Sequence, residues 1–226
     1  MASTFFGLHI GSSALSSFQV ATNTTANNIA NVKTTGYTRQ EATLQAKDAI
    51  NVTARYGSVG TGVTVTSIKQ QRDLYYDNKY WENNSCYGRY EQKLYYMEQI
   101  QNYFKDNGSS VKGFSSVFSQ MFSDLDTLRS KPSDKTVRNQ FISSAQSLCT
   151  YFNQMSDNLS KLQDDCNEEI RNNVDKINSI SEKISLLNKE INQIETGTGV
   201  EAGSLRDERA NLIDSLSKIV NVSYNE

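Results

Sequence analysis

The sequence is poor in the residues that most often carry chemistry or interrupt helices. Among 226 residues it has one proline and one histidine. A single proline leaves long helices uninterrupted, because proline in a helix interior removes a backbone hydrogen bond. A single histidine, His9, leaves little capacity for acid–base catalysis near neutral pH. We interpret His9 as a packed or solvent-facing side chain.

Cysteine is also scarce. Cys86, Cys149 and Cys166 show no C-x-x-C spacing, and their number is odd. This pattern indicates neither a zinc site nor a closed disulfide framework. Ordinary semi-buried thiols and one adventitious bridge both fit the pattern, so the oxidation state of the three stays open. No cofactor or metal is expected.

Strong charge and long apolar runs are absent. The formal net charge is −2, which argues against a nucleic acid or an anionic membrane as partner. No apolar run approaches the roughly 18 residues that a membrane span requires. The hydrophobic fraction of 37% implies a thin core for this length. These properties predict a mainly α protein, an elongated bundle of long helices.

The first 32 residues contain no Asp, Glu, Lys or Arg, and Lys33 is the first of these. Apolar residues recur there at helical spacing, at Phe6, Ile10, Ala14, Phe18 and Ala21, with Leu8, Leu15 and Ile29 nearby. Serine and threonine fill the gaps, so the apolar face is weak. Such a helix suits burial among copies or partners, and a disordered Ser/Thr-rich tail is the alternative. A basic start and a continuous apolar stretch are both missing, so we expect no cleaved signal peptide.

After Tyr37 the apolar period changes to two. Alternation at Ala42, Leu44 and Ala46 continues at Ile50, Val52, Ala54 and Tyr56, and Val63 and Val65 follow a glycine-rich stretch. This pattern predicts short antiparallel strands with glycine turns within residues 37–68.

Helical spacing then dominates from residue 69 onward. One stripe comprises Tyr76, Tyr80, Tyr87, Tyr90, Leu94, Met97 and Phe104, and a second comprises Val111, Phe114, Phe118, Met121, Leu125 and Leu128. Aromatic and apolar stripes at this spacing are usually core. Ser133 is the expected N-cap of the next helix, and Ser204 with Asp207 forms an S-x-x-D pattern that predicts the cap of the last one.

The helix after Ser133 is predicted to be the longest, about 90 Å if continuous from 133 to 195. Ile170, Ile177, Ile184 and Ile191 repeat every seven residues, with a four-residue stutter after Cys166. We therefore predict a helical bundle over residues 69–226, in which the isoleucine stripe packs on the two earlier stripes. The predicted core residues are Leu94, Met97, Phe118, Leu125, Ile177, Ile184, Leu187, Ile191, Leu212 and Leu216.

Several stretches resemble the bacterial flagellar axial proteins, which comprise rod, hook and hook-associated subunits. "NNIANVKTTGYTRQ" (27–40) is similar to a signature shared across that family. "GTGVTVTSIKQQRDLYYDNKY", "LYYMEQIQNYF", "FSQMFSDLDTLRSKPSD" and "EINQIETGTGVEAGSLRDERANLIDSLSKIVNV" narrow the likeness to hook-associated subunits of the hook–filament junction. The family usually has proline before the Gly-Tyr pair, where this chain has Thr35.

The resemblance implies that residues 1–36 form an inner-tube helix, residues 37–68 a connector and residues 69–226 an outer bundle. Family members are longer, so we expect this chain to stop before an outer domain and a C-terminal helix. The Asn-rich stretch would end the inner helix, and Gly36 would allow a turn with positive φ. The expected assembly interface comprises Phe6, Ile10, Phe18, Asn27, Asn28, Ile29, Asn31, Gly36 and Tyr37.

The resemblance also implies partners and a location. The expected partners are other copies of the chain, the hook protein, a second junction protein (hook-associated protein 3) and a flagellar export chaperone. The protein would leave the cell through the flagellar type III apparatus and act outside it, at the hook–filament junction.

Three alternatives remain at this point. Another rod or hook subunit would share the N-terminal signature. A stand-alone coiled-coil adaptor would explain the isoleucine heptads, but not the uncharged start. An enzyme such as a muramidase would need paired carboxylates in a cleft. The pairs Asp164–Asp165 and Glu168–Glu169 are each adjacent in sequence, so their members point to different sides of a helix.

Overall fold

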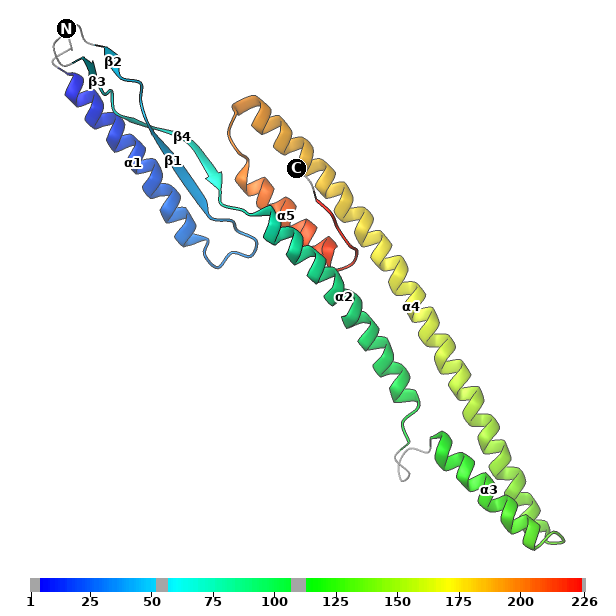
Figure 1. Ribbon diagram of the computed structural model, residues 1–226. Helices are drawn as coiled ribbons and strands as arrows, with labels where there is room; N and C mark the ends of the chain where they lie inside the picture. Colours follow the sequence, from blue (N-terminus) through cyan, green and yellow to red (C-terminus); the bar gives the residue numbers. More distant parts are fainter. Residues whose placement is uncertain (1–4, 52–56, 107–112, 225–226) are drawn as a thin grey trace. The chain divides into compact units, whose positions relative to one another are not determined.

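A computed structural model describes residues 5–51, 57–106 and 113–224 (Figure 1). Its helices are α1 (Phe6–Ala30), α2 (Leu74–Tyr103), α3 (Phe114–Ser130), α4 (Lys135–Thr198) and α5 (Gly203–Ser217). Its strands are β1 (Gln40–Ala46), β2 (Ile50–Asn51), β3 (Ser58–Val59) and β4 (Val63–Gln70). The predicted mainly α class, with a small β region after the N-terminal helix, is confirmed.

The chain divides into two compact units. Unit 1 comprises Met1–Ser85 and Ile177–Glu226, and unit 2 comprises Cys86–Lys176. Helices α2 and α4 each contribute one part to unit 1 and the other to unit 2.

The strands form the predicted antiparallel pairs. β1 pairs with β4 from Gln40↔Gln70 to Ala46↔Val63, and the register shifts between Thr43 and Leu44. β2 pairs with β3 through Ile50↔Val59 and Asn51↔Ser58. The remaining members of the predicted alternation, Val52, Ala54 and Tyr56, lie outside the described residues.

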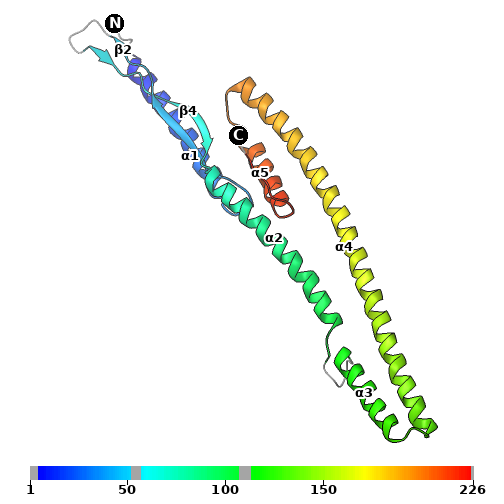
Figure 2. The same ribbon diagram turned by 45° about the vertical axis from the view of Figure 1, so that its right-hand side comes forward.

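Helix α1 packs along the β1–β4 ribbon within unit 1 (Figures 1 and 2). Small side chains permit this close approach: Ser17 is buried and its hydroxyl donates to the carbonyl of Val63 at 3.2 Å. A side chain at Gly62 would overlap the hydroxyl of Ser13. The uncharged helix therefore has a partner within its own chain, which its weak apolar face did not predict.

Helix α4 has 64 residues and a length of about 96 Å at 1.5 Å per residue. It begins two residues later than predicted. The capping side chain is Asp134, whose carboxylate accepts the amide of Thr136 at 2.8 Å, and the prediction of Ser133 as the cap was wrong.

The predicted core face of α2 was also wrong. Leu94 is 60% exposed and Met97 55% exposed. The rest of the stripe is exposed as well: Tyr76, Tyr80, Tyr87, Tyr90 and Phe104. In unit 2, α2 meets α4 through Gln92 and Tyr96, which both donate to Glu169. Tyrosines lie on more than one side of α2, so apolar spacing did not select the side that faces a neighbour.

The remaining core predictions had mixed outcomes. Leu187 and Ile191 are buried, whereas Ile177, Ile184, Leu212 and Leu216 are half-buried. Phe118 and Leu125 are exposed because α3 faces its neighbour through the adjacent positions Val117, Met121 and Leu128, which are half-buried. Val111 lies outside the described residues. The other buried hydrophobic side chains among the described residues are Trp81, Met155, Ala202, Ala210 and Ile213.

Candidate assembly interface

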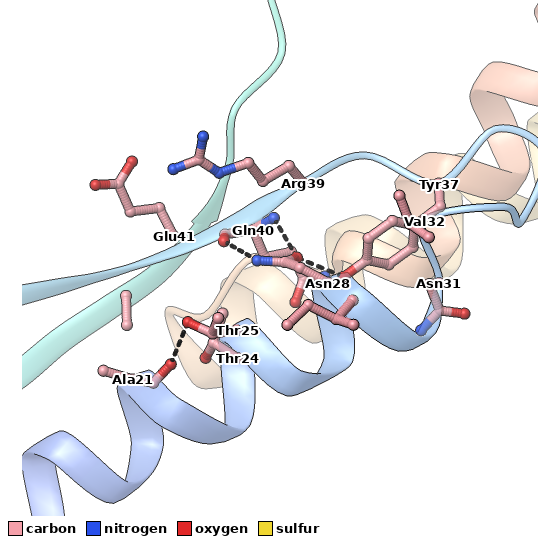
Figure 3. Close-up of a pocket in the computed structure, with 12 residues that line it drawn as sticks. Ala21, Thr24, Thr25, Asn28, Asn31, Val32, Tyr37, Arg39, Gln40 and Glu41 are labelled. Carbon is pink, nitrogen blue, oxygen red and sulfur yellow. Dashed lines mark hydrogen bonds between the residues drawn. The ribbon is translucent and has the colours of Figure 1, made fainter.

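The side chain of Asn28 fixes the turn between α1 and β1 (Figure 3). Its Nδ2 donates to the carbonyl of Gln40 at 2.8 Å, and its Oδ1 accepts the amide of Gln40 at 3.0 Å. The same Oδ1 accepts the hydroxyl of Tyr37 at 2.8 Å. Asparagine serves here because one side chain both donates and accepts. Two hydrogen bonds therefore hold Gln40, the first residue of β1, against the end of α1, and a third holds Tyr37.

The other two asparagines of the motif act at the helix end. Asn31 Nδ2 donates to the carbonyl of Asn27 at 3.0 Å and to its Oδ1 at 2.9 Å. Asn27 Nδ2 donates to the hydroxyl of Tyr37 at 3.1 Å. The expected capping of terminal carbonyls is thus present. The side-chain amides of Asn28 and Asn31 thus bond within their own chain, and their membership of an assembly interface stays a prediction.

Gly36 has a φ of 76°, as the predicted turn requires. A side chain there would also overlap the side-chain amide of Asn211 on α5. Glycine is therefore required at position 36 for two reasons: the positive φ of its backbone and the close approach of α5. Figure 3 shows Tyr37 directed back from this turn toward Asn28.

Asp207 of α5 binds one end of the β1–β4 ribbon, where β1 begins and β4 ends. Its Oδ2 accepts the amide of Thr38 at 3.2 Å, and its Oδ1 accepts Nε2 of Gln70 at 2.8 Å. The residue is buried. The predicted capping role with Ser204 was wrong, because the N-cap of α5 is Ala202 and no side chain caps it. Donors from distant segments, the Thr38 amide and the Gln70 side chain, engage this carboxylate in place of the local capping pattern.

Glu195, near the end of α4, holds the start of α5. Its carboxylate receives Nε and Nη2 of Arg206 at 2.7 and 2.8 Å and the amide of Ala202 at 3.0 Å. The hydrogen bond from Arg206 is the main reason that the pKa of Glu195 falls to about 2. Arg206 also lies 3.7 Å from Glu201, whose carboxylate accepts the amide of Gln70 at 3.0 Å. This network links α4, α5 and β4.

Trp81 anchors α2 to α5 within unit 1. It is 2% exposed, and its indole N–H donates to Asp214 at 2.6 Å. One turn later, Asn84 Nδ2 donates to the hydroxyl of Ser217 at 2.8 Å. Apolar spacing does not predict the burial of Trp81, because polar residues surround it in the sequence. Its being the only tryptophan of the chain was the available signal.

The side of α1 away from the ribbon remains apolar and uncovered. Leu8, Leu15, Phe18 and Ile29 are each at least 59% exposed. Together with Gly11, Thr22 and Thr25 they follow a spacing of alternating three and four residues, which forms one continuous stripe. We call Leu8, Leu15, Phe18 and Ile29 the outer face of α1.

Two predicted interface residues lie on the other side. Phe6 and Ile10 are half-buried, and by helical spacing they share a side with Ser13 and Ser17, which face the ribbon. Of the predicted interface set, only Phe18 and Ile29 belong to the outer face.

A groove of about 600 Å³ runs between the end of α1 and β1 (Figure 3). Its walls include Asn28, Tyr37 and Gln40, whose hydrogen bonds were described above. Ile29 and Val32 line the same groove, and both are exposed. The groove therefore borders the apolar outer face.

In the described part of the chain, residues of the types that bind metals do not cluster. No group of three or more His, Cys, Asp or Glu residues there could hold a metal ion. Glu169 is occupied by Gln92 and Tyr96, and its hydrogen bond raises the pKa of the Tyr96 hydroxyl. The three cysteines are free thiols; Cys86 and Cys149 are exposed and Cys166 is half-buried. Within the described helices, none combines the length and apolarity that crossing a bilayer demands.

Comparison with known families identifies the chain. Residues 97–226 match the flagellar hook-associated protein FlgK helical domain, and residues 8–38 match the flagella basal body rod protein family. The first match alone covers more than half of the 226 residues. The chain belongs to the flagellar hook-associated protein FlgK family. The second match covers most of α1 and the Asn-rich turn.

Relatives in this family carry the name flagellar hook-associated protein 1. The chain is 34% identical to that of Bacillus subtilis (strain 168) over 100% of its own length and 45% of the relative. It is 32% identical to that of Salmonella typhimurium (strain LT2), covering 93% of the chain and 37% of the relative. For Escherichia coli (strain K12) the identity is 30%, over 93% and 38%. The chain thus spans less than half the length of these relatives.

Membership in a family of structural flagellar proteins confirms the prediction that the chain is not an enzyme. It also confirms the flagellum as its setting.

Proposed function

We propose that the chain is part of a subunit of the hook–filament junction, and that it assembles through the outer face of α1. The supporting observation is the uncharged, apolar and uncovered side of a helix whose opposite side is already packed on its own strands. Exposed apolar patches of this kind mark interaction sites. Because α1 lacks charged residues, burial between subunits leaves no charge to desolvate.

The turn after α1 gives this face a defined setting. Asn28 ties the helix to β1, and Asp207 ties the strand ends to α5. A load or a docking event at α1 is therefore transmitted to the α2–α5 part of unit 1 through hydrogen bonds rather than through a loose linker. In this proposal the Asn-rich motif positions the interface from within its own subunit.

The proposal includes export and partners. The subunit leaves the cell through the flagellar type III apparatus without cleavage of residues 1–32. It acts outside the cell and contacts other copies of itself, the hook protein and a second junction protein, hook-associated protein 3. An export chaperone accompanies it before secretion. The relatives' names support the hook setting.

The test replaces two outer-face residues by Leu15→Gln and Phe18→Gln in one variant. Ser16→Gln is the matched control, since Ser16 is exposed on the same helix but lies off the apolar stripe. The gene for each variant is introduced into a strain from which the native gene has been deleted. Secretion into the medium, occupancy of hook ends in electron micrographs and motility are measured.

We expect the double variant to be secreted and folded but absent from hook ends, while the control assembles and restores motility. Normal assembly of the double variant would exclude the outer face as the interface. Purified chain that forms a small stable oligomer without hooks would instead support a coiled-coil adaptor.

A further inference from the structure

The two edges of the β1–β4 ribbon are protected unequally. The outer edge of β4 is bound near both of its ends: the amide of Gln70 donates to Glu201 at 3.0 Å, and the carbonyl of Val63 accepts the hydroxyl of Ser17 at 3.2 Å. Natural sheets cover their edges in such ways, because unpaired backbone groups invite another strand. The outer edge of β1 has one comparable contact among the described residues, at its first residue.

This contact shows which backbone groups of β1 point outward. Backbone groups alternate in direction along an antiparallel strand. The carbonyl of Arg39 accepts the amide of Gln71 at 2.8 Å, so Arg39 faces the side of β4 and Gln40 faces away from it. The side chain of Asn28 binds both the amide and the carbonyl of Gln40, as a neighbouring strand would (Figure 3).

Three later residues of β1 also face outward. At the far end of the strand, the amide of Lys47 donates to the carbonyl of Gly62 at 2.9 Å. Odd-numbered positions therefore still face β4 after the register shift, and even-numbered positions face away. The outward-facing positions for which the described residues offer no backbone partner are Ala42, Leu44 and Ala46. We call these three residues the open edge of β1.

The sequence of this strand is complementary to itself. Residues 41–47 read EATLQAK. When two copies run antiparallel with Leu44 opposite Leu44, Ala42 of each copy lies opposite Ala46 of the other, so open residues meet only open residues. In the same register Glu41 lies opposite Lys47, and both side chains are exposed. Opposite charges that face each other across two strands stabilise the pair.

The space beside the open edge suits a second copy. The groove between α1 and β1 lies there, and its helical wall includes Ala21, Thr25 and Ile29, each one turn from the next. In a pair of ribbons, the ribbon centres are two strand spacings apart, about 10 Å. The two α1 helices, each packed on the same face of the joined sheet, would then lie at the 8–10 Å spacing typical of packed helices.

We propose that two copies of the chain pair through the open edge of β1 and form one antiparallel sheet in the order β4, β1, β1, β4. The inference goes beyond the proposed function and does not rest on it, since it concerns copies outside an assembly. The pair covers Ile29 of the outer face of α1, so it separates before that face is used. Because small interfaces are weak, the pair dissociates on dilution, unlike the stable oligomer of a coiled-coil adaptor.

Sedimentation velocity of the 226-residue chain over a range of concentrations measures this pairing. The test variants are Lys47→Glu and Glu41→Lys, each of which places like charges opposite one another in the pair. Lys189→Glu is the matched control, because it makes the same change of charge as Lys47→Glu at an exposed position of α4. Trp81 fluorescence shows whether each variant has folded.

The parent and Lys189→Glu should form a dimer at high concentration. Each test variant alone should pair about tenfold more weakly or less, because like charges directly opposite one another repel. An equimolar mixture of the two test variants should pair as tightly as the parent, since every contact between positions 41 and 47 then joins opposite charges. Mixing would not restore pairing if the substitutions had only disturbed the fold.

Hydrogen exchange measured by NMR identifies the backbone that pairs. The amides of Ala42, Leu44 and Ala46 should exchange about tenfold more slowly at concentrations at which the dimer forms than in the monomer. A chain that stays monomeric at millimolar concentration would overturn the proposal. Failure of the mixed variants to pair, or a dimer in which these three amides exchange as fast as in the monomer, would overturn it as well.

Discussion

Asp207 accepts the side-chain amide of Gln70 at 2.8 Å, joining residues 137 positions apart in the sequence. Its other oxygen accepts the amide of Thr38. One carboxylate thereby ties a single end of the β1–β4 ribbon, where β1 begins and β4 ends, to α5. All of these groups belong to unit 1, which also contains Trp81, the only tryptophan of the chain. Trp81 fluorescence therefore reports the unfolding of this unit in the experiments below.

Replacing Asp207 by alanine should destabilise unit 1 by about 1–3 kcal/mol, because Thr38 and Gln70 lose a buried acceptor. Urea unfolding followed by Trp81 fluorescence measures the loss. Glu208→Ala is the control, since Glu208 is its exposed neighbour on the same helix. Equal effects of the two substitutions would mean that the Asp207 contacts contribute nothing beyond a surface charge.

Gly36→Ala should cost about 1–2 kcal/mol from the positive φ alone, and more from overlap with Asn211. Adding Asn211→Gly should restore the stability lost through the overlap, whereas the loss due to the positive φ should remain. Gly60→Ala is the control, because the space around Gly60 is open and its φ is not positive. Chemical denaturation of the four proteins separates the two contributions. Full recovery in the double variant would contradict the role given to backbone conformation.

The stability of unit 1 should fall in acid through Glu195. Its pKa is lowered from 4.5 to about 2 in the folded chain, so the folded state binds fewer protons than the unfolded state between these values. The stabilisation is complete above about pH 4.5 and is lost as the pH falls toward 2. Since the side chain is still 25% exposed, we expect about 1–2 kcal/mol rather than the full linkage value.

Denaturant unfolding at a series of pH values between 5 and 2 tests this (about the range over which carboxylates titrate). Glu195→Gln should be less stable than the parent at neutral pH and should lose less stability on acidification. Glu190→Gln, at an exposed position of the same helix, should follow the parent curve. Parallel curves for Glu195→Gln and the parent would show that the Arg206 contact is not the acid-sensitive group.

The loss of stability on replacing isoleucines of α4 by alanine should depend on how deeply each side chain is buried, and not on its place in the heptad repeat. Ile191→Ala should cost about 2–4 kcal/mol, because Ile191 is 4% exposed. Ile184→Ala should cost less, since Ile184 is half-buried, and Ile194→Ala should cost least. Thermal and urea unfolding of the three variants give the order. Equal losses at Ile184 and Ile194 would indicate that the exposed part of the stripe is covered in solution.

Local sequence patterns were sufficient to predict the order of the helices and strands. The change from helical spacing to alternation after Tyr37, and back again near residue 70, marked α1, the strands and α2 in their correct order. Gly36 was found from its place in the motif, because few residues other than glycine adopt a positive φ. These features depend on neighbours in sequence, which a local pattern records.

The partners of polar side chains needed the tertiary structure. Asp207 fits a local capping pattern, and only the approach of Thr38 and Gln70 diverts it. Trp81 is buried where Asp214 of α5 accepts its indole N–H and the ring of Tyr224 packs edge-on against its own.

The sequence by itself determined the helical class, the uncharged first helix, the glycine turn and the resemblance to flagellar axial proteins. Tertiary structure alone decided which side of each helix is covered. Leu94 and Met97 satisfy helical spacing as well as Ile191 does, yet only Ile191 is buried. Spacing places residues on a common side, whereas burial requires a neighbour at that side, and spacing along one helix does not record which segment supplies that neighbour.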